Sequence, residues 1–338
     1  MTDQNSASRA SGAAGARAGG SLFLLAMDHR ASLARTVYGI EGEPGPAQVG
    51  LIAAGKRLVF QGLLAAVEAG ADPARTGVLV DERYGADVAR RAREAGLTLA
   101  MPIERSGQDW FTLEYGTLGE DRWLDHVEEF DPRYVKVLVR DNPAFDADRR
   151  RAQQDDLAVV TRALHDRGRS LLVELLVPPT DEQKGHDHPG HPDGDYDTEV
   201  RPRLTRQVIS EMQRAGVEPD IWKVEGLDSA EDAARVVATA QQGGRDAVRC
   251  IVLGRDAPPS VLDRWLSVAA GVTGFEGFAI GRSIWEQPLA DELAGSVSER
   301  GSVHEIADRY LRYVGVYTDH TDHTAHTAHA AHTAHRTE

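Results

Sequence analysis

Short apolar runs and stretches with helical periodicity alternate along the chain from Ser21 onward. Continuous apolar runs are typical of strands buried on both faces, and apolar residues recurring every three or four positions are typical of amphipathic helices. The pattern predicts these strands: Leu22–Met27, Val78–Val80, Leu97–Ile103, Tyr134–Val139, Ser170–Val177, Asp220–Leu227, Val248–Leu253 and Gly274–Ile280. It predicts helices over Ala47–Ala69, Ala86–Ala95, Asp121–Phe130, Ala147–Arg167, Tyr196–Ala215, Ser229–Gln242 and Ser260–Ala270, with further helix to about Val316.

The repeated strand–helix unit predicts a closed α/β fold. A strand followed by a helix eight times within about 250–300 residues is the pattern of a (β/α)8 TIM barrel. We expect one barrel domain over residues 21–316, an Ala/Gly/Ser-rich disordered tail without a signal peptide over 1–20, and a His-rich disordered tail over 317–338. The alternative is a doubly wound open sheet. It is disfavoured because no Gly-rich dinucleotide fingerprint follows the first strand.

A charged pair interrupts the sixth predicted strand. Lys223 lies in the middle of this apolar run, and Glu225 follows two residues later on the same side of the strand. A lysine in an apolar setting gives up its proton more easily, and its neutral amine can attack a carbonyl to form a Schiff base. The alternative is a structural Lys–Glu pair inside a barrel.

Lysine is rare in this chain, which sharpens that choice. Among 38 Lys+Arg residues the lysines are Lys56, Lys136, Lys184 and Lys223. Arg cannot lose its proton in a protein, so a lysine kept where Arg is the rule indicates a task that Arg cannot perform. Two of these lysines, Lys136 and Lys223, lie inside apolar strand-like runs.

Three charged residues fall on neighbouring predicted strands. Lys136 is on the fourth strand, Glu174 on the fifth and Lys223 on the sixth, so the three can meet inside a barrel. The cation of Lys136 would favour the neutral form of Lys223, and Glu174 would shuttle protons. The alternative is a buried structural triad, which would be a costly way to stabilise a core.

Polar residues gather where the predicted strands end. In a barrel these ends carry the active site, although each residue alone is equally typical of a loop. Gly254-Arg255 and Gly281-Arg282 follow the seventh and eighth strands, where glycine backbone amides and Arg side chains suit a phosphate group. The other polar strand ends are Asp28-His29-Arg30, Asp81-Glu82, Glu104 and Arg140.

Composition limits the partners that we expect. A net charge of -15 and a pI near 5.3 argue against nucleic acid and anionic membranes as partners. No apolar stretch approaches the ~20 residues of a membrane span. Cys250 is the single cysteine, which excludes an internal disulfide and fits a reducing, cytoplasmic location. The sequence leaves a homo-oligomer open.

Several ordered motifs resemble the 2-deoxy-5-keto-D-gluconate 6-phosphate aldolase domain of inositol catabolism and, more distantly, the tagatose-bisphosphate class I aldolases. The resemblance spans about Leu22 to Leu289. It implies that Lys223 is the Schiff-base lysine, that Glu174 is the acid/base, and that Lys136, Asp28 and Glu104 line the site. The motifs are Leu25–Arg30, Val80–Glu82, Lys136–Pro143, Glu174–Pro179, Trp222–Gly226 and Gly277–Trp285.

The expected function is therefore that of a class I aldolase without metal or cofactor. By the resemblance, it would cleave a phosphorylated keto sugar acid to dihydroxyacetone phosphate and malonate semialdehyde. Arg255 and Arg282 would hold the phosphate, and Arg30 or Arg140 would hold the carboxylate. Glu225 is expected among the substrate-binding residues. The alternatives are an aldolase for another ketose phosphate and a phosphosugar-binding regulator without turnover.

Two histidine-rich stretches raise the question of metal. Gln183–Asp195 carries His186, His188 and His191, but no residues at the strand ends converge with it, so we expect a mobile polar loop. The tail repeats histidine every third residue from His320. We expect it to chelate Ni²⁺ or Zn²⁺ loosely and to take no part in catalysis.

Overall fold

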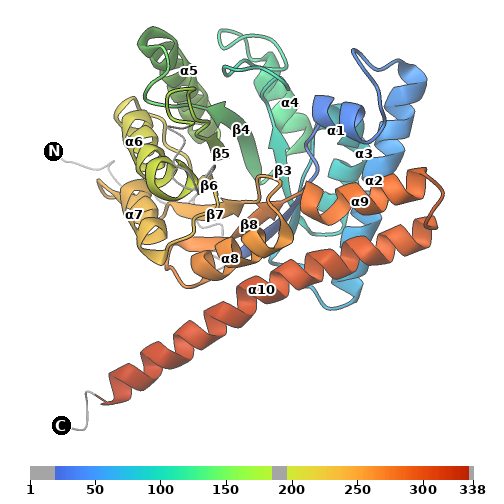
Figure 1. The fold of residues 1–338 in the computed structure, drawn as a ribbon. Helices are drawn as coiled ribbons and strands as arrows, with labels where there is room; N and C mark the ends of the chain where they lie inside the picture. The colour runs from blue at the N-terminus through green and yellow to red at the C-terminus, as the bar shows by residue number, and fades with distance from the viewer. Residues whose placement is uncertain (1–19, 185–195, 335–338) are drawn as a thin grey trace, which may run out of the picture.

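The computed structural model describes residues 20–184 and 196–334, with side chains up to Thr321. Eight parallel strands pair in chain order, and β8 pairs with β1 to close the barrel (Figure 1). This confirms the predicted TIM barrel and excludes the doubly wound sheet. The strands are β1 Leu22–Ala26, β2 Thr76–Leu79, β3 Thr98–Pro102, β4 Tyr134–Arg140, β5 Ser170–Leu176, β6 Ile221–Glu225, β7 Arg249–Leu253 and β8 Phe275–Ile280.

Helices surround the barrel on its outside (Figure 1). A short helix, α1, follows Arg30 and was not predicted from the sequence. A π-helical turn, η1, opens the predicted helix at Tyr196. The helices are α1 Ala31–Thr36, α2 Pro46–Glu68, α3 Glu82–Glu94, α4 Arg122–Phe130, α5 Ala147–His165, η1 Tyr196–Val200, α6 Arg201–Arg214, α7 Ala230–Gln241, α8 Pro259–Ala270, α9 Arg282–Leu293 and α10 Glu299–Ala334.

Alternation along the strands divides the core into two layers. Successive side chains on a strand point to opposite faces, so every second residue enters the barrel interior. Tyr134, Leu172 and Ile221 belong to the inner apolar cluster, on strands β4, β5 and β6. Two residues further along each strand, the same inward direction falls on Lys136, Glu174 and Lys223. The remaining inner residues are Leu22, Leu24, Ala26, Leu79, Ala100, Ile251 and Ala279.

The last helix, α10, extends across the predicted domain boundary at Val316. Helix α10 packs against α2, α8 and α9 and then continues past the barrel (Figure 1). The Tyr317 side chain is fully buried, and its hydroxyl accepts a hydrogen bond from the Gly277 amide and donates to the Phe275 carbonyl. The packed core therefore includes Tyr317, one residue past the predicted boundary at Val316. The backbone of α10 is helical to Ala334.

Helix α2 is long and apolar enough to cross a membrane by length and composition alone, in contrast to the expectation that no apolar stretch approaches this length. Half of its most apolar window is buried inside the protein. Ile52, Phe60 and Leu63 are among its buried residues and belong to the outer core layer. A core helix of a barrel has this composition for that reason.

Candidate active site

Glu174 joins the two strand lysines at the centre of the barrel. Its Oε1 lies 3.0 Å from Lys223 Nζ, and its Oε2 lies 2.9 Å from Lys136 Nζ. The strand register produces this contact, since Glu174 pairs directly with Lys223 across β5 and β6. Both lysines are about 2% exposed, and only the inward alternation of three adjacent strands brings the three groups together. The predicted triad is thus assembled.

Lys136 is shared by three carboxylates. Besides Glu174, its Nζ lies 2.8 Å from Asp28 Oδ2 and 2.9 Å from Glu104 Oε1. Asp28 comes from the end of β1, and Glu104 follows β3. Burial alone would lower the pKa of Lys136, but the three carboxylates raise it well above its usual value. Lys136 therefore stays protonated.

The pKa values of the three carboxylates shift in different directions. Burial opposes ionisation of Asp28, yet Lys136 and Lys223 hold its pKa far below its usual value. Burial likewise opposes ionisation of Glu174, and the same two lysines lower its pKa. For Glu104 burial dominates over Lys136 and Arg30, so its pKa is raised. Glu174 is thus an ionised base in direct contact with Lys223.

A cavity of about 510 Å³ opens above this centre. Of the predicted site residues, all but Glu225 line it. Glu225 contacts a residue that does line the cavity, because its carboxylate pairs with Arg255 at 2.9 Å. The same carboxylate accepts a hydrogen bond from the Val177 amide at 2.9 Å. The predicted residues on the wall are Asp28, Arg30, Glu104, Lys136, Arg140, Glu174, Lys223, Gly254, Arg255, Gly281 and Arg282.

His29 also lines the cavity, as a neutral imidazole. Its ring packs edge-on against Trp285, with the ring centres 5.5 Å apart. Burial lowers the pKa of His29 to about 4, with Arg282 and Lys223 acting in the same direction. Its Nδ1 is buried without a hydrogen-bond partner in the described part of the chain. A bound ligand could satisfy that atom.

The two Arg residues considered for a substrate carboxylate are held differently. Arg30 donates to the Glu104 backbone oxygen at 2.7 Å and also pairs with the carboxylates of Glu104 and Glu114. Within the described residues, the Arg140 side chain makes one hydrogen bond, from Nη1 to the Gln108 carbonyl at 3.0 Å. Arg140 is therefore the more available of the two cations.

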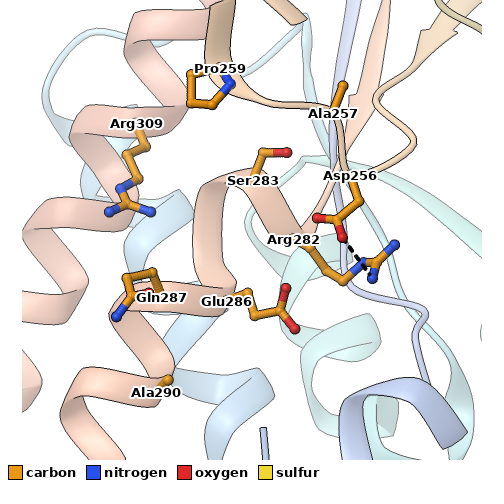
Figure 2. A pocket seen from close by; sticks show the side chains of 9 residues that line it. All are labelled: Asp256, Ala257, Pro259, Arg282, Ser283, Glu286, Gln287, Ala290 and Arg309. Carbon is orange, nitrogen blue, oxygen red and sulfur yellow. Dashed lines mark ion pairs between the residues drawn. The ribbon is translucent and has the colours of Figure 1, made fainter. Parts of the chain in front are cut away.

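The Arg residues after β7 and β8 both have acidic neighbours. Arg255 is held by Asp197 and Glu225, the closest contact being 2.5 Å. Arg282 pairs with Asp256 at 3.1 Å, as Figure 2 shows, and lies between the main cavity and a second hollow of about 320 Å³. An anion entering the main cavity would compete with these carboxylates for the two guanidinium groups.

Backbone geometry in these loops is demanding. Arg255 and Asp256 adopt φ angles of 44° and 57°, a left-handed conformation that is unfavourable for residues other than glycine. A Cβ on Gly281 would lie 2.4 Å from the Ala26 carbonyl oxygen, so only glycine fits there. Gly254 has no such conflict. The Gly281 position thus has a packing reason that is independent of any phosphate.

Two other sequence features fall outside the cavity. Asp81 was expected at a polar strand end facing the site. It instead pairs with Lys56 of α2 and caps α3 through the Tyr84 amide. Lys56 was not singled out from the sequence because it lies in a helix, although the scarcity of lysine in this chain was a usable signal. His186, His188 and His191 lie outside the described residues, and no cluster that could hold a metal ion occurs in the described ranges.

The barrel is similar to fructose-bisphosphate aldolases of known structure. The enzyme from Plasmodium falciparum matches with a TM-score of 0.60 and 12% identity, over 89% of this chain and 90% of its own. An archaeal fructose 1,6-bisphosphate aldolase matches with a TM-score of 0.52 and 15% identity, over 88% of this chain and 95% of its own. Another archaeal enzyme, with its catalytic Lys covalently bound to the carbinolamine intermediate of its substrate, matches with a TM-score of 0.50 and 14% identity, over 86% of this chain and 94% of its own.

At identities this low, the likeness establishes a shared fold. No curated protein matches the sequence. A family model described as "Uncharacterized protein conserved in bacteria (DUF2090)" matches residues 12–321, which is most of the chain. The chain therefore belongs to the DUF2090 family.

Proposed function

We propose that this protein is a class I aldolase that forms a Schiff base through Lys223. The observation that carries the proposal is the position of Glu174, whose two oxygens contact Lys223 Nζ at 3.0 Å and Lys136 Nζ at 2.9 Å beneath the cavity. An amine nucleophile needs an adjacent base to take its proton, and this arrangement supplies one.

Schiff-base formation follows from these contacts. Glu174 Oε1 accepts a proton from Lys223, and the neutral amine attacks the substrate ketone to form a carbinolamine. Glu174 then returns this proton to the carbinolamine hydroxyl, which leaves as water. An iminium ion remains, and Glu174 is again an ionised base. Lys136 remains charged throughout because three carboxylates surround it, so its positive charge can stabilise negative charge that develops on the oxygen atoms of the reacting carbon chain.

The iminium then serves as the electron sink for cleavage. With the ketone at C5, Glu174 removes the proton from the C3 hydroxyl, directly or through a water molecule. The C3–C4 bond breaks, its electron pair moves into the iminium, and an enamine forms on Lys223. Protonation of the enamine and hydrolysis release dihydroxyacetone phosphate, while C1 to C3 leave as malonate semialdehyde.

The substrate in this proposal is 2-deoxy-5-keto-D-gluconate 6-phosphate, on the strength of the motif resemblance. The cavity has cations for both charged ends of this substrate, the phosphate and the carboxylate. Arg255 and Arg282 lie after β7 and β8, the usual phosphate side of this fold. Arg140 lines the cavity at the end of β4 and is available for the carboxylate. If this is the substrate, the protein acts in inositol catabolism.

A second candidate is an aldolase for another ketose phosphate. The fold is shared with fructose-bisphosphate aldolases, which act on a substrate with a phosphate at each end. A phosphosugar-binding regulator without turnover is disfavoured, because it would have no need for an ionised base in contact with a buried lysine.

Borohydride trapping tests the proposal directly. Incubation with dihydroxyacetone phosphate and borohydride should reduce the iminium and label Lys223 irreversibly, as located by peptide mass mapping. Lys223→Met should abolish the label, and Lys184→Met is the control because Lys184 is exposed. Labelling of Lys136, or no labelling at all, would contradict the assignment. Turnover with a panel of ketose phosphates then separates the two substrates and the regulator.

A further inference from the structure

Lys56 is a third buried lysine that the proposed chemistry does not use. It lies in the middle of α2, is about 1% exposed, and does not line the cavity. A lysine facing the core from an outer helix is unfavourable unless each of its donors is paired. In a chain where nearly all cations are Arg, its presence at this position requires an explanation.

The Lys56 ammonium contacts the backbone on both sides of Asp28. Its Nζ donates to the Met27 carbonyl at 2.6 Å and to the His29 carbonyl at 3.1 Å. Its third partner is the Asp81 carboxylate, which is also buried. Three acceptors match the three donors of an ammonium group, whereas the planar fork of Arg does not fit this convergence.

Asp81 anchors this arrangement to the next helix. Its other oxygen accepts a hydrogen bond from the Tyr84 amide at 3.0 Å and so caps α3. The end of β1 is thereby tied to α2 through Lys56 and to α3 through Asp81. The single residue between the two bound carbonyls is Asp28, and its carboxylate lies 2.8 Å from Lys136 Nζ.

We propose that Lys56 is a positioning residue that holds the Met27–His29 backbone so that the Asp28 carboxylate stays on Lys136. The inference rests on the proposed aldolase function only for its catalytic consequence. Asp28 is one of three carboxylates around the Lys136 cation. If Asp28 were displaced, Glu174 and Glu104 would be the remaining carboxylates that position Lys136. A displacement of about 1 Å at such a centre can lower a rate on the order of a hundredfold.

Two variants and a matched control test the inference. Lys56→Met removes all three contacts, and Asp81→Asn keeps an oxygen for the Tyr84 amide but removes the charge. Gln213→Met is the control, because Gln213 is also a buried polar side chain on an outer helix, where it donates to the Ala240 carbonyl at 2.7 Å away from the cavity. Measurements compare folded protein at equal concentration.

Hydrogen exchange of peptides covering residues 26–31 gives a readout that needs no substrate. We expect faster exchange there in Lys56→Met and in Asp81→Asn, and no change there in Gln213→Met. We expect kcat for aldol cleavage to fall about 10- to 100-fold in Lys56→Met, with KM changed less than about threefold. Unchanged exchange in residues 26–31, or a kcat loss no greater than in Gln213→Met, would overturn the inference.

Failure of the proposed function would give a different result. If the wild-type protein neither cleaves ketose phosphates nor is trapped at Lys223, the aldolase proposal fails, and hydrogen exchange alone decides whether Lys56 holds the end of β1. If the wild type is active and exchange rises without a fall in kcat, Lys56 is a structural residue and its positioning role is wrong.

Discussion

At the scale of single residues, the candidate site is an ion cluster whose members have unequal tasks. Glu174 contacts both Lys136 and Lys223. Of these two lysines, Asp28 and Glu104 contact Lys136 alone. Removing one member of a buried ion cluster leaves another charge unpaired, which destabilises the fold. Substitutions that keep shape and hydrogen bonding are therefore the informative ones here.

Glu174→Gln keeps the shape of the side chain and removes its ability to accept a proton. We expect kcat to fall by about 10²–10⁴-fold, the usual contribution of a general base, with a smaller change in KM. Borohydride labelling of Lys223 should slow in parallel. Glu276→Gln is the matched control, because Glu276 pairs with Arg249 near the start of β8, at the opposite end of the barrel. Equal losses in the two variants would contradict the role of Glu174.

His29 makes folding stability depend on pH. Burial lowers the pKa of His29 to about 4 in the folded protein, from an ordinary value of 6.5. The unfolded chain thus takes up this proton at a higher pH than the folded one, and stability falls as pH drops from the ordinary pKa toward the folded value. Relative to His29→Gln, the wild type should lose free energy of unfolding between about pH 7 and about pH 5. Urea unfolding at both values measures this difference, and a constant difference would contradict the prediction.

At the scale of elements, the loops after β7 and β8 place two Arg side chains beside the cavity. Each of these Arg side chains forms an ion pair with at least one carboxylate. Arg255 is held by two carboxylates, while Arg282 has one, Asp256, at 3.1 Å. Arg282 also begins α9, so a phosphate near it would meet free amides at the helix start. Arg282 is the better target for a test of the phosphate site.

Arg282→Ala should weaken the use of a phosphorylated substrate by roughly 1.5–3 kcal/mol, the contribution of a hydrogen bond to a charged group. That corresponds to about a tenfold to hundredfold loss in kcat/KM. A non-phosphorylated analogue should be affected little, and Lys should rescue only in part because it lacks the fork of donors. Asp256→Asn is a companion variant that frees Arg282 and should not weaken phosphate use. Equal losses for both substrates in Arg282→Ala would make Arg282 structural.

At the scale of the whole molecule, α10 closes the outer layer next to the ends of the barrel. The Tyr310 hydroxyl of α10 donates a hydrogen bond to the Phe23 carbonyl at 2.9 Å. The Tyr317 hydroxyl forms hydrogen bonds with the backbone of Phe275 and Gly277 in β8. These contacts tie the end of the chain to the first and last strands. The His-rich segment begins just beyond them.

Truncation after Thr321 should therefore leave activity and thermal stability unchanged, while truncation after Val316 should lower Tm. The second truncation removes a fully buried tyrosine with two hydrogen bonds, each of which contributes about 0.5–1.5 kcal/mol in addition to the lost packing. Calorimetry of both truncated proteins measures the effect. Equal Tm values would show that Tyr317 contributes little.

Activity should also survive EDTA. A lysine-derived iminium accepts the electrons of the broken bond, so the proposed reaction needs no metal ion as an electron sink. The measurement is turnover after dialysis against EDTA, for the full chain and for the chain truncated after Thr321. Loss of activity that Zn²⁺ restores in the full chain would implicate the histidines that lie outside the described residues.

The sequence alone determined the number of strands and the inward position of Lys136, Glu174 and Lys223. Strand burial and alternation are local properties, so apolar runs and a period of two suffice to predict them. Neighbouring strands in a barrel follow the order of the chain, which made the meeting of these three residues predictable as well. The scarcity of lysine pointed to the same pair of lysines.

Only the tertiary structure decided how the other charges are shared. Whether Arg30 faces the substrate or Glu104, and whether Arg255 meets a phosphate or Asp197, depends on loop paths that no local pattern specifies. The same holds for Lys56, which reaches the end of β1 from a helix 27 residues further along the chain than His29. Side chains from distant segments pair according to the packing of helices on strands, and that packing is a property of the folded barrel as a whole.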